Sequence, residues 1–276
     1  MEKIKDRVYV ETGFLGCNPS FVVTKEGVVM IDTPQKPVEA FRWRKVVQEF
    51  GKVLYVFNTD HHFDHCLGNF YFDADLIMHQ GTARRLRAAE RVQKCKDWIR
   101  MLDPSAGHLI ENYCIRRPLV TYQSKMTLFV GGEIFELIHV TSHTEDETLI
   151  YLPNLKVLIT GDTVCTCGIP STYESYPVQW LDAVREIQGL DFDVVVPGHG
   201  EIGDRQSVKT FQAQFGGLVE TVRQRIKAGD KRDSIINEIK FEDIVHSKYP
   251  PSFSGVFGPG RMSINIGRIY DQLAAS

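Results

Sequence analysis

The sequence has no long hydrophobic run and no apolar segment at its amino terminus. No stretch of the 276 residues approaches the roughly 20 consecutive apolar residues of a membrane-spanning helix. The first residues, Met1 to Arg7, are mostly charged, which is not the pattern of a secretory signal peptide. We therefore expect a cytoplasmic protein that has no membrane partner.

Cysteine is sparse, and there is no excess of positive charge. Six cysteines in a chain without a signal peptide indicate reduced thiols rather than a disulfide framework. A net charge of −3 and a pI near 6.3 provide no basic surface for a phosphate backbone. We expect no nucleic-acid partner.

The chain does have a dense cluster of metal-binding side chains at residues 60–65, which read Asp-His-His-Phe-Asp-His. The cluster directly follows the apolar run at residues 53–57, a pattern that predicts a buried strand with the cluster on the loop at its carboxyl end. Carboxylates and imidazoles are ligands of divalent cations, and charges packed this densely would repel one another without a cation. The cluster therefore predicts more than one metal ion.

Three later motifs each contain one further candidate ligand, and each motif follows an apolar run. They are His143 in Thr-Ser-His-Thr, Asp162 in Thr-Gly-Asp-Thr and His199 in Val-Pro-Gly-His-Gly. Taken alone, the last two motifs are more often simple turns, in which an Asp accepts hydrogen bonds from turn amides. Their joint occurrence with the 60–65 cluster favours one shared site.

This set of motifs resembles that of the metallo-β-lactamase fold superfamily. The cluster matches the superfamily's His-x-His-x-Asp-His motif, except that Asp60 stands where the first His normally stands. With a turn at Asp32, the motifs follow the superfamily's order over about residues 8–204. The resemblance implies an α+β fold, a four-layer αββα sandwich with the metals in a groove at one edge of its two sheets.

The resemblance also implies how the ligands divide between two divalent ions. The first ion would be held by Asp60, His62 and His143, the second by Asp64, His65 and His199, and Asp162 would bridge them. Asp64 would also be catalytic, because it orients the attacking hydroxide. His61 occupies a variable position of the motif and is not expected to be a ligand.

Asp60 bears on which metal is bound. Zinc is the first expectation, but an extra carboxylate lowers the positive charge of the centre and suits harder ions such as Fe(II) or Mn(II). In the alternative, Asp60 turns away and the first site is weak or lost. The nearby thiols of Cys66, Cys165 and Cys167 could reach the metals, although small buried or loop thiols are the simpler interpretation.

The leading functional hypothesis is an enzyme, a binuclear metallohydrolase that acts on a small metabolite. Water bound to such ions ionises near neutral pH and can attack an ester, lactone, thioester or amide. A di-iron oxidoreductase and a non-catalytic binding protein on the same fold are the alternatives. We expect a small-molecule substrate, and a homo-oligomer is an open alternative.

The elements predicted along the chain form one domain, residues 1–276, with a core at about 8–204 and a helical C-terminal extension at about 205–276. Helices are expected at 37–50, 82–101, 178–188, 205–228, 231–239 and 262–274, and later strands at 118–122, 126–130, 134–141, 148–152, 156–160 and 192–196. The charged helix at 82–101 is a candidate lid. The Pro- and Gly-rich loop at 249–261 either closes over the metals, with Phe253, Phe257 or Arg261 touching substrate, or merely connects two helices.

Overall fold

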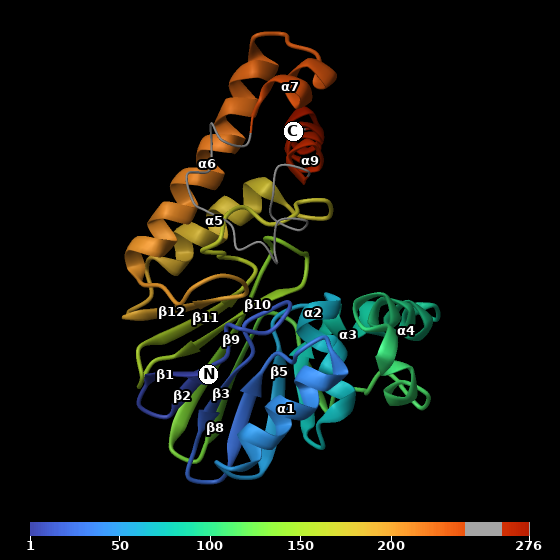
Figure 1. Cartoon of the computed structure of the whole chain (residues 1–276). Helices are drawn as coiled ribbons and strands as arrows, with labels where there is room; N and C mark the ends of the chain where they lie inside the picture. The colour runs from blue at the N-terminus through green and yellow to red at the C-terminus, as the bar shows by residue number, and fades with distance from the viewer. Residues whose placement is uncertain (241–260, 276) are drawn as a thin grey trace.

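Two β-sheets form the centre of the molecule in the computed structural model, which describes residues 1–240 and 261–275 (Figure 1). The first sheet has seven strands in the order β1 to β7. Its strands are β1 Glu2–Lys5, β2 Val8–Val10, β3 Ser20–Val23, β4 Val28–Ile31, β5 Val53–Asn58, β6 Asp75–His79 and β7 Val120–Tyr122. Strands β1 to β4 pair antiparallel and β4 to β7 pair parallel, so β5 delivers the 60–65 cluster at one edge of the sheet.

The second sheet has five strands in the order β12-β11-β10-β9-β8. Its strands are β8 Lys125–Val130, β9 Glu133–Val140, β10 Glu147–Leu152, β11 Val157–Gly161 and β12 Val194–Pro197. All residues of β10 and β11 are buried, as expected of strands covered on both faces. The predicted positions of these strands are confirmed to within a few residues.

Three separate apolar cores lie between four layers. Between the sheets, Phe57 meets Phe135 edge to face with ring centroids 5.6 Å apart. Helix α1 (Pro37–Gln48) covers the outer face of the first sheet, where Trp43 packs on Phe21. Helices α5 (Pro177–Ile187) and α6 (Arg205–Lys227) cover the second sheet in the same way. This arrangement confirms the predicted αββα sandwich.

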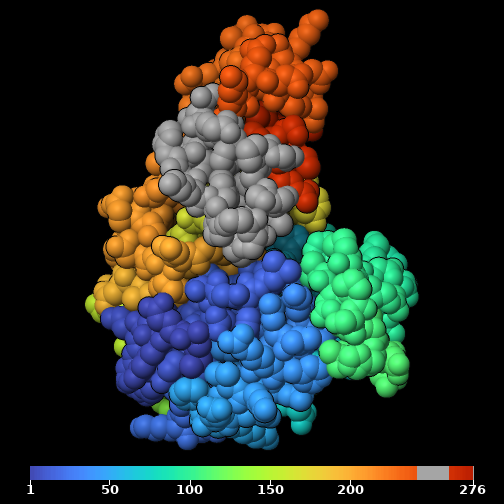
Figure 2. All heavy atoms as spheres, viewed as in Figure 1, coloured from blue at the N-terminus to red at the C-terminus, as the bar shows by residue number. Residues whose placement is uncertain are grey.

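The prediction of one helix at 82–101 is wrong. The structure has two helices here, α3 (Gln80–Leu86) and α4 (Arg91–Leu102), followed by the 3-10 helix η2 (Pro104–Leu109). The apolar periodicity continues across the break because Leu86 of α3 and Cys95 of α4 are both buried in the core on the outer face of the first sheet. Helix α4 and η2 form a lobe on the side of the molecule (Figure 2).

The predicted C-terminal helices are confirmed as α6, α7 (Arg232–Glu238) and α9 (Met262–Ala274). Helix α9 packs on α6 and ties down the loop at 170–176, since Asn265 donates to Pro170 O and accepts from Thr172 N. This loop proves to be part of the candidate site. No helix within residues 1–240 and 261–275 is long and apolar enough to cross a membrane.

Candidate metal centre

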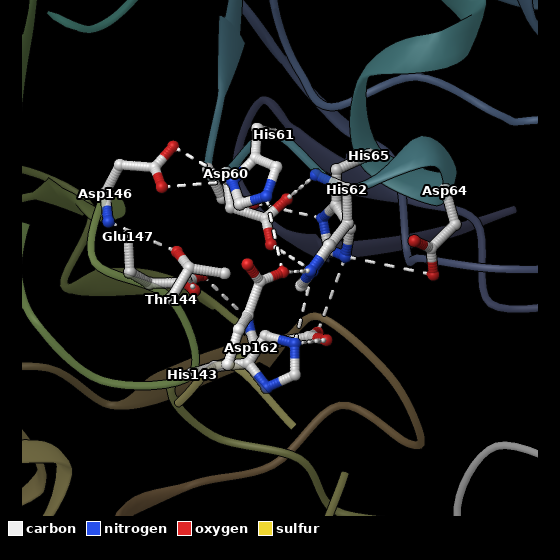
Figure 3. Close-up of polar contacts among 12 residues, drawn as sticks. Asp60, His61, His62, Asp64, His65, His143, Thr144, Asp146, Glu147 and Asp162 are labelled. Carbon is white, nitrogen blue, oxygen red and sulfur yellow. Dashed lines mark hydrogen bonds and ion pairs between the residues drawn. The ribbon is translucent and has the colours of Figure 1, made fainter. Parts of the chain in front are cut away.

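A tight turn after β5 aims the side chains of the 60–65 cluster. Asp60 Oδ1 accepts a hydrogen bond from His62 N at 2.9 Å, and Thr59 N donates to Asp32 Oδ1 at 2.8 Å. The short helices α2 (Phe63–Cys66) and η1 (Leu67–Tyr71) then begin, so that Asp64 and His65 point to a second position beside the first. The contiguous motif is therefore divided between two places by local backbone geometry (Figure 3).

Asp60, His62 and His143 make the first of these places. Asp60 Oδ2 lies 2.7 Å from His62 Nδ1, and His143 Nε2 lies 3.2 Å from the same nitrogen. His143 reaches the site from the loop after β9, in the second sheet. One atom from each of the three residues could therefore contact a single ion.

Asp64, His65 and His199 make the second place. His199 Nε2 lies 3.2 Å from Asp64 Oδ2, and His65 Nε2 lies 4.0 Å from it. His199 follows β12, so this group also joins the two sheets. Its three candidate ligand atoms likewise lie within reach of one ion.

Asp162 lies between the two groups, on the turn that follows β11. Its Oδ1 is 3.5 Å from His65 Nε2 and 3.3 Å from His199 Nε2, whereas its Oδ2 is 3.4 Å from His143 Nε2. One carboxylate oxygen thus faces each group. This is the orientation that a bridging ligand requires.

Unsatisfied and crowded polar groups test whether these residues fit a metal pair. His65 Nε2 is buried and makes no hydrogen bond, although buried polar atoms are normally paired, and the only close polar contact of Asp60 Oδ2 among the described residues is His62 Nδ1 at 2.7 Å. The carboxyls of Asp60, Asp162 and Glu147 are buried close together, and burial with these two negative neighbours raises the pKa of Glu147 well above its usual range. Divalent cations would satisfy the open atoms and offset the charge, so the residues fit the group.

The histidines of the centre carry opposite pKa shifts. Burial opposes protonation of His199, yet the neighbouring Asp162 and Asp64 raise its pKa to about 9. Burial, together with the nearby His62 ring, lowers the pKa of His143 to about 4. In the metal-free protein, His199 is therefore a charged partner of the carboxylates, whereas His143 is already neutral and ready to bind an ion.

The far ring nitrogen of three candidate ligands is held by a fixed acceptor. His65 Nδ1 lies 2.8 Å from Asp32 Oδ2, and His199 Nδ1 lies 2.9 Å from Gly16 O. His62 Nε2 lies 2.6 Å from Glu174 Oε1. Such contacts fix the tautomer and aim the other nitrogen at the metal.

His61 faces away from both groups. Its Nδ1 lies 3.0 Å from Asp146 Oδ1, and its Nε2 lies 3.4 Å from Glu174 Oε1. Asp146 also accepts from Thr82 Oγ1 at 2.6 Å, so the pair is part of a buried network. His61, His62 and Glu174 also lie close enough together to share an ion, so the absence of His61 from the ligands stays a prediction.

Sequence reasoning missed Glu174 and did not predict the contact between Asp146 and His61. Glu174 lies in an irregular loop with no motif or periodicity, so no signal in the sequence pointed to it.

The cysteines near the centre are buried, protonated thiols. Cys66 Sγ donates to His62 O at 3.0 Å, and burial raises its pKa to about 12. Cys165 Sγ lies 3.9 Å from Asp162 Oδ1, and burial together with that carboxylate raises its pKa well above the usual range. Neither thiol belongs to the two groups of candidate ligands.

A cavity of about 300 Å³ opens onto the candidate ligands. Besides ligand side chains, it is lined by Leu15, Phe63, Trp98, Pro170, Tyr173 and Arg261. The region predicted as a lid thus contributes Trp98 of α4 to the cavity wall. Arg261 lines the cavity, whereas Phe253 and Phe257 lie outside the described residues.

Comparison with known proteins supplies the family. The model of the metallo-beta-lactamase superfamily matches residues 12–199, which include every candidate ligand of the four motifs. The chain belongs to the metallo-beta-lactamase superfamily. The predicted family is thereby confirmed.

Individual relatives are distant. The 2,4-dinitroanisole O-demethylase subunit alpha of Nocardioides sp. (strain JS1661) is 29% identical over 203 residues, which are 68% of this chain and 53% of that protein. The metallo-beta-lactamase type 2 of Elizabethkingia meningoseptica is 25% identical over 225 residues, 76% of this chain and 82% of the relative. The chain thus spans only about half the length of the first of these relatives.

A solved structure extends the likeness in fold to nearly the whole chain. The stereoselective inverting sec-alkylsulfatase Pisa1 from Pseudomonas sp. superposes with a TM-score of 0.72 at 15% identity, and the match covers 98% of this chain and 49% of that chain. The C-terminal helices are therefore included in the shared fold.

Proposed function

We propose that this chain is a binuclear metal-dependent hydrolase that cleaves an ester, lactone, thioester or amide bond of a small metabolite. The observation that carries the proposal is the position of Asp162, with one carboxylate oxygen toward each group of candidate ligands. A carboxylate in this position suits a pair of ions, because each of its oxygens can contact a different ion.

The first ion would be held by Asp60, His62 and His143, and the second by Asp64, His65 and His199. When bound, such ions lower the pKa of water and polarise the bond under attack. Asp162 fixes the distance between the two positions.

Side chains of this protein would orient the attacking water and hold the ligand atoms in position. Asp64 is half-buried and lines the cavity. Its carboxylate can therefore accept a hydrogen bond from the attacking water and orient that water. His62, held by Glu174, and His65, held by Asp32, keep the ligand atoms in place.

The relatives widen the choice of bond to be tested. One is named as an O-demethylase of 2,4-dinitroanisole and another as a metallo-beta-lactamase. Aryl methyl ethers and β-lactams therefore join esters, lactones, thioesters and amides in the substrate panel. We keep zinc as the first candidate metal.

A second candidate function, a di-iron oxidoreductase, is favoured by one specific observation. Asp60 Oδ2 points at His62 Nδ1 within the first group, so the donor set has a carboxylate where the superfamily motif has a His. Carboxylate-rich sites suit iron and manganese better than zinc.

Element-resolved metal content tests both candidates. The protein is purified anaerobically without chelators, and zinc, iron and manganese are measured per chain. About two zinc ions per chain would support the hydrolase and direct work to the substrate panel. Two iron ions that change oxidation state with an added oxidant would favour the oxidoreductase, and protein that binds no metal even from excess zinc would contradict both.

A further inference from the structure

One wall of the cavity is an apolar platform built from three separate parts of the chain. Leu15 comes from the loop before β3, Phe63 from the start of α2 and Trp98 from α4. The rings of Phe63 and Trp98 lie 5.6 Å apart at an angle of 42°. None of these three residues is a candidate metal ligand.

Gln35 fixes the position of Trp98. The indole Nε1 of Trp98 donates to Gln35 Oε1 at 2.7 Å, and Gln35 Nε2 donates to Leu15 O at 3.1 Å. One amide thus ties the lobe of α4 to the loop that carries Leu15. The indole N–H and the amide are engaged with each other and with the backbone, so they are not free to recognise a polar substrate group.

Arg91 fixes the position of Phe63. Its guanidinium lies over the phenyl ring, 4.1 Å from the centroid, and it also donates a hydrogen bond to His61 O. The ring is therefore held from behind while it lines the cavity. Two aromatic rings oriented in advance in this way cost little to order when a ligand binds.

Other residues that line the cavity differ in chemistry from this platform. Ser171 Oγ lines the cavity and makes no hydrogen bond within the described residues, and the side chains of Tyr173 and Arg261 also lie there. Polar parts of a ligand would find partners there, whereas the apolar platform is adjoined only by the engaged amide of Gln35. On the Trp98 side they would lose hydration without compensation.

We propose that the substrate carries a flat aromatic group beside the reacting bond and that this ring packs against Trp98 and Phe63. The inference rests on the proposed function for the chemistry at the metals and adds the class of substrate. A flat ring gains from stacking on Trp98 in addition to the burial of its surface, whereas a puckered ring of similar size gains only the burial.

Three methyl esters with the same leaving group test the proposal in the metal-loaded protein. They are methyl phenylacetate, methyl cyclohexylacetate and methyl acetate, so that the phenyl and cyclohexyl compounds differ only in their ring. We expect kcat/KM for phenyl to exceed that for cyclohexyl roughly three- to tenfold. A ratio near one in the wild-type protein would overturn the proposal.

Variants of Trp98 test whether this side chain causes the preference for the phenyl ester. Trp98→Leu should bring the phenyl-to-cyclohexyl ratio close to one, and Trp98→Phe should keep most of it because it keeps a ring. Phe129→Leu is the matched control, since Phe129 is 76% exposed on β8 and does not line the cavity. A ratio unchanged by Trp98→Leu would assign the preference elsewhere and overturn the role of this wall.

A binding measurement separates this inference from the proposed function. Trp43 is buried in a core away from the cavity, whereas Trp180 packs on His143 with centroids 5.5 Å apart, so comparison with Trp98→Phe identifies the part of the tryptophan fluorescence that comes from Trp98. We expect phenylacetate to quench this signal at lower concentration than cyclohexylacetate, and Trp98→Phe to abolish the response. Selective quenching by metal-loaded protein that hydrolyses no ester, lactone, thioester or amide of the substrate panel would refute the proposed reaction but support the aromatic site. Hydrolysis with equal binding of both acids would support the reaction and refute the aromatic site.

Discussion

Glu174 Oε1 lies 2.6 Å from Nε2 of His62, while Nδ1 of the same ring faces Asp60 and His143. Burial opposes ionisation of Glu174, yet its hydrogen bonds with His61 and His62 lower its pKa below the usual range. Arg85 of α3 donates to the other carboxylate oxygen at 3.1 Å. An ionised carboxylate therefore connects α3 to a candidate metal ligand.

Replacing Glu174 tests this connection. Glu174→Gln should weaken metal binding at the first position roughly 10- to 100-fold, because the His62 ring loses its charged acceptor. Competition with a chelator measures the change. Glu145→Gln is the control, since Glu145 is exposed and also pairs with Arg85; equal affinities in both variants would show that Glu174 does not position His62.

Asp162 and His61 should respond in opposite ways to removal. Asp162→Ala should lose most of one metal ion per chain and nearly all turnover, because neither group of ligands then has its shared carboxylate. His61→Ala should keep the metal and lose roughly 1–3 kcal/mol of stability, since buried Asp146 loses a partner. Metal analysis and thermal unfolding measure both effects, and loss of metal in His61→Ala alone would show that the assignment of ligands is shifted by one residue.

Asp60 should set both the choice of metal and the pH profile. Asp60→His removes one negative charge, so water in the centre should ionise about one to three pH units lower. The acid limb of the plot of kcat against pH should therefore shift to lower pH. The metal preference should shift toward zinc. Asp60→Asn removes the charge but keeps an oxygen, so it should move the limb in the same direction; an unmoved limb in both variants would mean that Asp60 does not act on the centre.

The metal-free protein should lose stability as pH rises. The pKa of His199 is about 9 in the folded chain and about 6.5 when unfolded, so its protonated form stabilises the fold below about pH 6.5 and this contribution is lost by about pH 9. The full difference corresponds to about 3 kcal/mol. We expect the Tm of metal-free protein to fall over this range and that of metal-loaded protein to change little, because an ion takes the place of the proton.

Chelator treatment followed by thermal unfolding at several pH values measures this effect. His199→Asn should make the profile of the metal-free protein less steep, while His61, His62 and His65, whose pKa values are also raised by neighbouring carboxylates, keep part of the pH dependence. A metal-free Tm that rises between pH 6.5 and 9 would contradict the assigned role of Asp162 and Asp64 as partners of protonated His199.

The sequence determined the family, the sandwich and the residues that could bind metal. The 60–65 cluster is contiguous, and one tight turn after a strand is enough to aim its side chains. His143, Asp162 and His199 could be found because each follows an apolar strand, and such strands are recognisable from local pattern. Local sequence pattern was therefore enough to predict most of the candidate ligands.

Only the tertiary structure decided what surrounds those ligands. Glu174 and His62 are 112 positions apart, and Gln35 and Trp98 are 63 apart, in segments without any shared motif. The break between α3 and α4 could not be predicted from the sequence either, because the apolar residues of both helices are buried in one core and follow a helical period. Which side chains meet across such distances depends on how sheets, helices and loops pack together, and that packing is a property of the whole chain.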